Sequence, residues 1–115
     1  MTDKLTTAAY EKALGLETVC AGKNRTITGC YIGDLLSWVL GRAGTGQVWL
    51  TVMSNVNVAA VASMADVACV VLCESAKADP ELTERAKKLG LPIFKTGKTA
   101  YDIAVETYRL LKTKE

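Results

Sequence analysis

Apolar residues recur along this chain in two spacings, and each spacing predicts a different kind of element. Positions three or four residues apart predict amphipathic helices, and short apolar runs bounded by glycine, proline or polar residues predict strands. The predicted helices cover residues 7–14, 35–40, 55–65, 79–89 and 99–113. The predicted strands cover residues 17–20, 26–32, 47–53, 68–73 and 92–95. The candidate helix caps are Thr6 or Thr7, Asp34, Ser54 or Asn55, Asp79 before Pro80, and Thr99.

From residue 47 onward strands and helices alternate, which is the order of a parallel sheet with crossover helices. The strand at residues 68–73 is almost purely apolar, as expected where both faces of a sheet are covered. We therefore predict an α/β fold, layered, with a mostly parallel sheet of four to six strands flanked by helices. The length of 115 residues predicts one domain over residues 1–115.

The helix at residues 55–65 has no strongly polar face, because Asp66 is the only charged residue between Ala43 and Cys73. A helix that is apolar all round is expected to be buried on two sides. Another copy of the chain would supply the second covering and make the protein a homo-oligomer. The alternative is burial by the chain's own N-terminal segment. Trp38 and Trp49 are expected to be core or interface residues.

Composition narrows the classes of partner. Half of the residues are apolar and the net charge is +2, so bulk charge does not favour nucleic acid or an anionic membrane. The N-terminus has no apolar stretch of signal-peptide type, and Asn57, Ser63 and Asp66 interrupt the most apolar region, at residues 56–73. We expect a cytoplasmic protein without a membrane span.

Residue types that carry chemistry are scarce. The chain has no histidine, which removes the commonest general base, and its carboxylates do not cluster into an acid–base pair. The cysteines contain no Cys-x-x-Cys pair and lie in or beside apolar, strand-like segments, so buried thiols are favoured over a redox or metal role. We predict no catalytic residues, no cofactor and no metal site. The four cysteines are Cys20, Cys30, Cys69 and Cys73.

Two glycine-containing loops resemble phosphate loops. The loop at residues 41–46 leaves a helix and enters a strand, which is the wrong context, so a helix stop and a turn are favoured. Residues 94–99 follow a strand, open a helix and end in Gly-Lys-Thr, but Pro92 occupies the position of the first glycine. An ATPase is therefore not predicted. Capping by Thr99, with Asp102 three residues later, and a modest anion site both stay open.

Polar residues follow three successive strands of the predicted sheet. Open parallel sheets bind ligands outside the carboxyl ends of their strands, so these residues form the predicted ligand site. Asparagine amides could read the polar edges of a base, and a lysine with free helix amides could hold an anion. The predicted site residues are Ser54, Asn55, Asn57, Glu74, Ser75, Thr96, Gly97, Lys98, Thr99 and Tyr101.

Three segments resemble a known family, at residues 31–40 (YIGDLLSWVL), 48–63 (VWLTVMSNVNVAAVAS) and 86–94 (AKKLGLPIF). Together they resemble the DRTGG domain, similar to the N-terminal domain of HPr kinase/phosphorylase, from about Ile27 to Tyr108. The resemblance implies an α/β layered domain, usually dimeric, that accompanies catalytic or nucleotide-sensing domains and performs no known reaction itself. This chain resembles the stand-alone, single-domain type, which is found near iron hydrogenase genes.

The chain departs from the family pattern at two places. The Asp-Arg of the family falls near residues 54–57, where this chain has asparagines, and its Thr-Gly-Gly falls near Cys73-Glu74-Ser75. The leading hypothesis is a non-catalytic regulatory domain that binds a small anionic or nucleotide-like ligand, such as a phosphorylated small molecule, as a homodimer or higher homo-oligomer. The alternative is a protein-interaction adaptor, associated with a hydrogenase or redox system, that has no small ligand.

Overall fold

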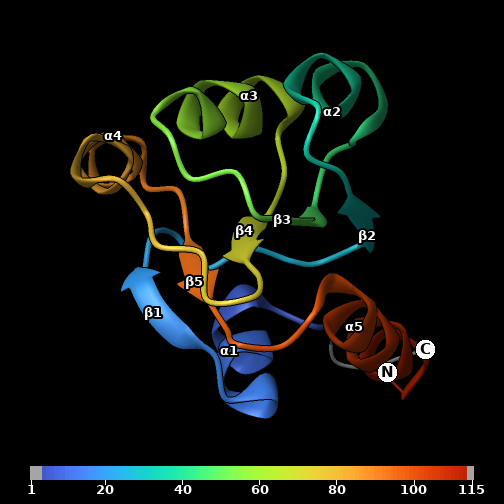
Figure 1. Ribbon diagram of the computed structural model, residues 1–115. Helices are drawn as coiled ribbons and strands as arrows, with labels where there is room; N and C mark the ends of the chain where they lie inside the picture. The colour runs from blue at the N-terminus through green and yellow to red at the C-terminus, as the bar shows by residue number, and fades with distance from the viewer. Residues whose placement is uncertain (1–3, 114–115) are drawn as a thin grey trace.

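The computed structural model describes residues 4–113, which form one five-stranded sheet and five helices (Figure 1). The helices are α1 (Thr7–Leu14), α2 (Leu36–Arg42), α3 (Asn57–Ala65), α4 (Pro80–Leu89) and α5 (Ala100–Thr113). The strands are β1 (Glu17–Cys20), β2 (Gly29–Ile32), β3 (Gln47–Thr51), β4 (Cys69–Leu72) and β5 (Ile93–Lys95). None of these helices is both long enough and apolar enough to cross a membrane.

The strands lie in the order β1-β5-β4-β3-β2. β2, β3, β4 and β5 are parallel to their neighbours, and β1 is added to β5 in the antiparallel direction. The prediction of an α/β fold with a mostly parallel sheet of four to six strands is confirmed, although the sheet is mixed and not wholly parallel. The parallel part follows from the alternation of strands and helices that the sequence shows.

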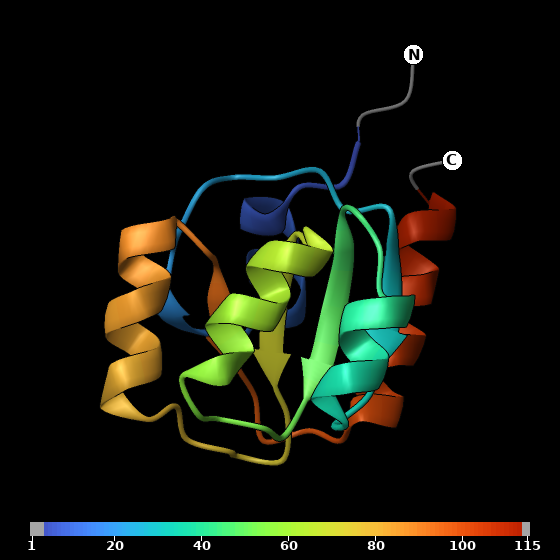
Figure 2. The same ribbon diagram turned by 90° about the horizontal axis from the view of Figure 1, so that it is seen from above.

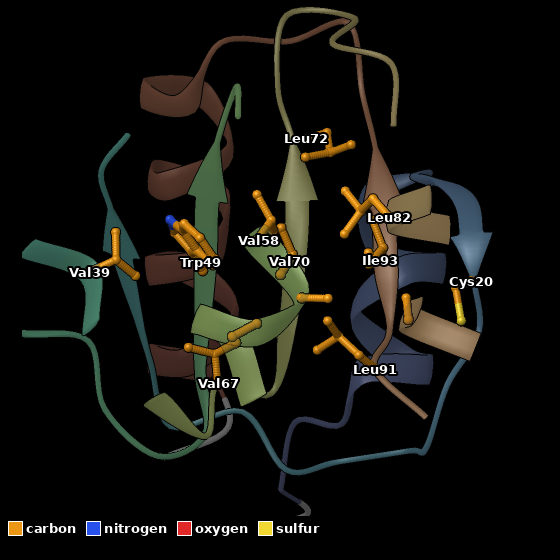
Figure 3. Close-up of a cluster of buried hydrophobic side chains, with 13 residues drawn as sticks. Cys20, Val39, Trp49, Val58, Val67, Val70, Leu72, Leu82, Leu91 and Ile93 are labelled. Atoms are coloured by element: carbon orange, nitrogen blue, oxygen red, sulfur yellow. The ribbon is translucent and has the colours of Figure 1, made fainter. Parts of the chain in front are cut away.

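Helices cover both faces of the sheet. α2, α3 and α4 lie on one face, and α1 and α5 lie on the other (Figure 1). The core under α2, α3 and α4 is built around Trp49, with Val39, Val58, Leu72 and Leu82 (Figure 3). The second core includes Tyr10, Leu50, Phe94 and Ile103. The apolar strand β4 contributes to both cores, which explains why it has no polar face.

The helix boundaries follow the sequence signals at some ends. The Thr6 hydroxyl accepts a hydrogen bond from the Ala9 N–H at 3.3 Å, and Gly15 ends α1 with φ of 64°. Pro80 stands in the first turn of α4, and Gly90 ends that helix with φ of 67°. These are the positions in which a cap, an N-terminal proline and a left-handed glycine are favoured.

Other predicted signals are wrong or only partly confirmed. Asp34 does not cap α2, because its Oδ1 accepts hydrogen bonds from the Thr51 hydroxyl at 2.7 Å and the Val52 N–H at 3.0 Å. Asp79 stands at the N-cap position of α4, as predicted, but its side chain makes no cap bond. α3 begins at Asn57, two residues later than expected, and the Asn55 side chain accepts from the Asn57 N–H at 2.9 Å. The second strand begins at Gly29, since Thr26 pairs with Thr6 in an isolated bridge instead.

Within one chain, α3 is buried on one side only. Val58, Ala59 and Ala62 are buried against the sheet and the neighbouring helices, but Met64 is 72% exposed. The N-terminal segment does not supply a second covering, because α1 packs on the opposite face of the sheet (Figure 1). The apolar composition of α3 comes largely from small residues such as alanine. Small apolar side chains can stay exposed at little cost, so one buried face is enough to hold this helix within a single chain.

Candidate functional site

The predicted site residues follow the carboxyl ends of three parallel strands. In Figure 2 these ends lie at the lower edge of the sheet, where the loops after β3, β4 and β5 run side by side. Ser54 and Asn55 follow β3, Glu74 and Ser75 follow β4, and Thr96 follows β5. The carboxyl edge of the sheet is therefore polar, in the place where open α/β sheets bind ligands.

The loop after β4 connects its two neighbours through backbone hydrogen bonds. The Glu74 N–H donates to the Lys98 carbonyl, and the Ser75 N–H donates to the Thr96 carbonyl, both at 2.9 Å. Further along the same loop, the Asp79 N–H donates to the Ser54 carbonyl at 3.0 Å. The loop at residues 73–79 thus spans the edge, and its first half lies directly against the loop that follows β5.

Glu74 and Ser75 have left-handed backbone conformations, with φ of 57° and 63°. A residue with a Cβ loses roughly 1–2 kcal/mol in this conformation, and glycine avoids the cost. Both residues carry side chains in a conformation that glycine would adopt without strain. The turn therefore presents a carboxylate and a hydroxyl at the carboxyl edge of the sheet.

A hollow of about 290 Å³ lies beside this turn, lined by Gly15, Glu17, Ser75, Lys95, Thr96 and Gly97. The Lys95 ammonium and the Glu17 carboxylate form an ion pair across β1 and β5 at 3.0 Å. Within residues 4–113 the Ser75 hydroxyl and the Gly97 N–H have no protein partner. An ammonium, a hydroxyl and a free amide are groups that hold a small anion.

Three residues that line this hollow were not predicted, namely Gly15, Glu17 and Lys95. They come together because β1 is antiparallel, so that its first residue lies at the carboxyl edge and Glu17 stands opposite Lys95. No short-range sequence signal reports which strand pairs with β1. The opposite charges of Glu17 and Lys95, each at the end of a predicted strand, were the one available indication.

The Gly-Lys-Thr segment forms a cap. The Thr99 hydroxyl accepts from the Asp102 N–H at 3.2 Å, and the Thr96 hydroxyl accepts from the Lys98 N–H at 3.2 Å. The Lys98 ammonium lies 3.3 Å from the carboxylate of Glu106, which lies in the second turn of α5. The capping interpretation is therefore confirmed, and the Lys98 side chain is directed along α5 and not over the loop.

The remaining site residues lie apart from this group. Asn55 and Asn57 lead into α3, on the face of the sheet opposite α5 (Figure 2). The Asn57 side chain is exposed and has no partner within residues 4–113. Tyr101 is 74% exposed on α5, beside an open hollow of about 430 Å³ that Lys98 also lines. The structure thus joins Glu74 and Ser75 with residues 96–99 and leaves the asparagines and Tyr101 outside that group.

The cysteines contain no activated thiol among those with a shifted pKa. Burial raises the pKa of Cys30 and of Cys73 to about 11, and it raises the pKa of Cys69 well above the ordinary value. The thiolate is the nucleophile and the metal ligand, so a raised pKa disfavours both roles. Among residues 4–113 no three cysteine or carboxylate side chains are grouped as metal ligands would be.

The five-stranded sheet with helices on both faces defines a small layered α/β domain. A family model described as the DRTGG domain matches residues 17–110, and the chain belongs to this family. No curated protein sequence matches the chain.

A solved structure shares this fold. It contains the CBS and DRTGG domains of the regulatory region of a Clostridium perfringens pyrophosphatase, in complex with the activator diadenosine tetraphosphate. The TM-score is 0.70 at 11% sequence identity, and the match covers 95% of this chain but 46% of that one. At this identity the likeness shows the fold alone.

Proposed function

We propose that this chain is a non-catalytic regulatory domain that binds a small anionic or nucleotide-like ligand at the carboxyl edge of its sheet and acts as a homo-oligomer. Two comparisons support the proposal. The chain belongs to the DRTGG family, and the similar solved structure is part of a regulatory region in complex with a dinucleotide activator. We further propose that this regulatory domain is cytoplasmic.

The hollow at the carboxyl edge is the observation that carries the proposal. Its volume of about 290 Å³ is at the lower end of the range for ligand pockets, so it suits a phosphate group and not a whole nucleotide. The Lys95 ammonium would hold the anion, with the Ser75 hydroxyl and the Gly97 N–H donating to it. Glu17 is exposed and Lys95 is half-buried, so their ion pair at the surface contributes little to stability, and an anion that replaces Glu17 at the ammonium costs little.

Ligand binding is tested by thermal denaturation and isothermal titration calorimetry with diadenosine tetraphosphate, ATP, AMP and inorganic phosphate. A ligand present at 100 times its Kd stabilises the folded state by about 2.7 kcal/mol, which is a measurable rise in Tm. We expect at least one phosphorylated compound to give such a rise at millimolar concentration. No rise with any of them would contradict the small-ligand function.

Two substitutions at the hollow sharpen the test. Lys95→Gln removes the cation, and we expect it to weaken anion binding by roughly tenfold, which corresponds to about 1.4 kcal/mol. Glu17→Gln removes the competing carboxylate, so binding should become tighter. Lys88→Gln is the matched control, since Lys88 is exposed near the end of α4, close to the amino ends of the parallel strands and away from the hollow. If Lys95→Gln and Lys88→Gln weakened anion binding equally, only the net charge of the protein would matter, and the hollow would not be the binding site.

The second candidate function is a protein-interaction adaptor without a small ligand. One observation favours it, namely that Tyr101 and Tyr108 are 74% and 63% exposed on α5. Exposed tyrosines are enriched at protein interfaces, where the ring buries area and the hydroxyl stays wet. A chain that responds to no phosphorylated compound would favour this function.

A further inference from the structure

The two edges of the sheet are built differently. The β1 edge carries the charged residue Glu17, and its pairing with β5 is irregular between Thr18 and Cys20. Charges and irregular pairing are ordinary means of preventing an edge strand from pairing with another chain. β2 forms the other edge, with the sequence Gly-Cys-Tyr-Ile and a regular register against β3. It has no charged residue, no proline and no bulge, so nothing on this strand opposes the addition of a further strand.

Exposed apolar side chains lie on both sides of the β2 edge. Tyr31 packs against the core under α2, and Cys30 packs against the core under α5. Because side chains alternate along a strand, Ile32 lies on the same face as Cys30, and it is 51% exposed. On the other face, Leu35 and Trp38 are 57% and 52% exposed. A partner that covers all of these residues has to cover the edge itself and not one face of the sheet.

Leu35, just before α2, forms a stripe with two exposed residues of the helix. Leu35, Trp38 and Arg42 are separated by three and four residues, which places them on one side of the helix. The Arg42 guanidinium lies 3.7 Å from the centre of the Trp38 ring, so one face of the indole is already held in place. Tryptophan and arginine are the residues that most often dominate binding at protein interfaces.

Charge favours a second copy of this chain as the occupant. Within residues 29–42 the charged residues are Asp34, at the carboxyl edge of the sheet, and Arg42, at the end of α2. In a two-fold contact the same surface is used by both copies in opposite directions. Two antiparallel β2 strands would therefore bring Asp34 of each copy toward Arg42 of the other, with α2 beside α2 in the same layer.

We propose that the surface formed by β2, Ile32, Leu35, Trp38 and Arg42, called here the β2 edge surface, is where a second copy of this chain docks. The two sheets then continue into one another through antiparallel β2 strands. This inference rests on the homo-oligomer part of the proposed function and gives it a location. It replaces the outer face of α3 as the contact, since Met64 is the only large hydrophobic residue that is strongly exposed there among the described residues.

Sedimentation equilibrium and light scattering of the 115-residue chain test the proposal. We expect a mass of two chains, each of 12.3 kDa. Ile32→Lys places a charge on the edge strand, and Trp38→Glu removes the anchor from α2. Each should weaken the dimer by 100-fold or more. Met64→Lys is the matched control, because it adds the same charge at an exposed apolar residue of α3, and it should leave the dimer unchanged. Thermal melts followed by circular dichroism establish that each variant is folded.

Tryptophan fluorescence gives a second, independent measurement. Trp49 is fully buried within one chain, whereas Trp38 is half exposed and would be covered only in the dimer. Dilution should therefore shift the emission of the wild-type chain to longer wavelength, and Trp38→Phe should abolish this shift.

Three results would overturn the proposal. They are a monomer at every concentration, a closed assembly of three or more chains, and a dimer that Met64→Lys dissociates while Ile32→Lys and Trp38→Glu do not. None of these results depends on ligand binding, which is measured separately on the same samples. A monomer that still binds a phosphorylated compound would remove the dimer and keep the ligand function.

Discussion

Glu74 and Ser75 have strained backbone conformations and exposed side chains at the carboxyl edge of the sheet. Both are exposed, so neither side chain is needed for the core, yet both hold a backbone conformation that suits glycine. Their N–H groups bond to the Lys98 and Thr96 carbonyls, and these bonds fix the turn against the next loop. The side chains therefore stand at this edge at the expense of stability, which is a pattern found at binding sites.

Replacing Ser75 by glycine should stabilise the fold. The left-handed conformation costs a serine roughly 1–2 kcal/mol, which glycine avoids. Glycine is also freer in the unfolded chain, and this reduces the stabilisation by about 0.5–1 kcal/mol. We expect Ser75→Gly to raise the free energy of unfolding by about 0.5–1 kcal/mol, measured by urea denaturation. Ala76→Gly is the matched control: Ala76 is not left-handed, so the same change should destabilise. A destabilised Ser75→Gly variant would contradict the account of strain.

Asp34 shows why sequence signals for single residues mislead. An aspartate before an apolar helical run is a strong capping signal, and the residue type alone cannot indicate a competing acceptor site. Here the Thr51 hydroxyl and the Val52 N–H, 17 and 18 residues away in sequence, donate hydrogen bonds to the Asp34 carboxylate instead. The bond joins the end of β3 to the start of the α2 segment, so Asp34 organises the carboxyl edge of the sheet and not the helix.

At the scale of elements, one buried hydrogen bond joins α1 to α5. The Tyr10 hydroxyl lies 2.6 Å from the Thr107 hydroxyl, and Thr107 in turn donates to the Ile103 carbonyl at 2.7 Å. Because the Thr107 proton is used by Ile103, Tyr10 donates its own proton to Thr107. Both side chains are fully buried. This bond fixes the register of two helices that are 97 residues apart in sequence at this point.

Removing Thr107 alone should cost at least as much as removing both partners of this bond. Thr107→Val leaves the Tyr10 hydroxyl buried without an acceptor, which costs about 1–3 kcal/mol. Tyr10→Phe leaves Thr107 bonded to Ile103, so a loss of about 1 kcal/mol is expected. The double variant should be no less stable than Thr107→Val alone. Urea denaturation of the four proteins gives the coupling energy, and strictly additive losses would show that the hydroxyls do not interact.

The elements that the sequence predicted are those with local signals. α1, α4 and α5 have caps, a proline or amphipathic spacing, and the strands from residue 47 onward have apolar runs between them. The order of the sheet is different, because β1 pairs with β5 across more than 70 residues and no local signal marks this partner. Gly15, Glu17 and Lys95 were therefore missed at the candidate site, whereas the loops after β4 and β5 were placed correctly at one edge.

At the scale of the whole molecule, the α1 and α5 layer holds Tyr10 and three of the four cysteines. Cys30, Cys69 and Cys73 belong to the same core as Tyr10, on one face of β2 and β4. Burial raises the pKa of all four groups. Tyr10, Cys30 and Cys69 also stand near cysteine thiols that become negative when they ionise, and Cys73 stands near the Glu74 and Asp34 carboxylates. This layer is therefore stable only while its thiols and phenol stay neutral, which links the stability of the fold to pH.

Stability should fall as the solution becomes alkaline. The folded pKa of Cys30 and of Cys73 is about 11, against an ordinary value of 9.0, so above pH 9 the unfolded chain releases protons that the folded chain retains. The stabilisation from these two thiols is fully present below pH 9 and is lost as the pH rises through 11. The free energy of unfolding then falls by about 1.4 kcal/mol per pH unit for each thiol. Tyr10 adds to the decline from its ordinary value of 10.0 upward. Urea denaturation at a series of pH values under reducing conditions measures this slope. Cys30→Ala with Cys73→Ala should make it markedly shallower between pH 9 and 10, and an unchanged slope would assign the decline to other groups.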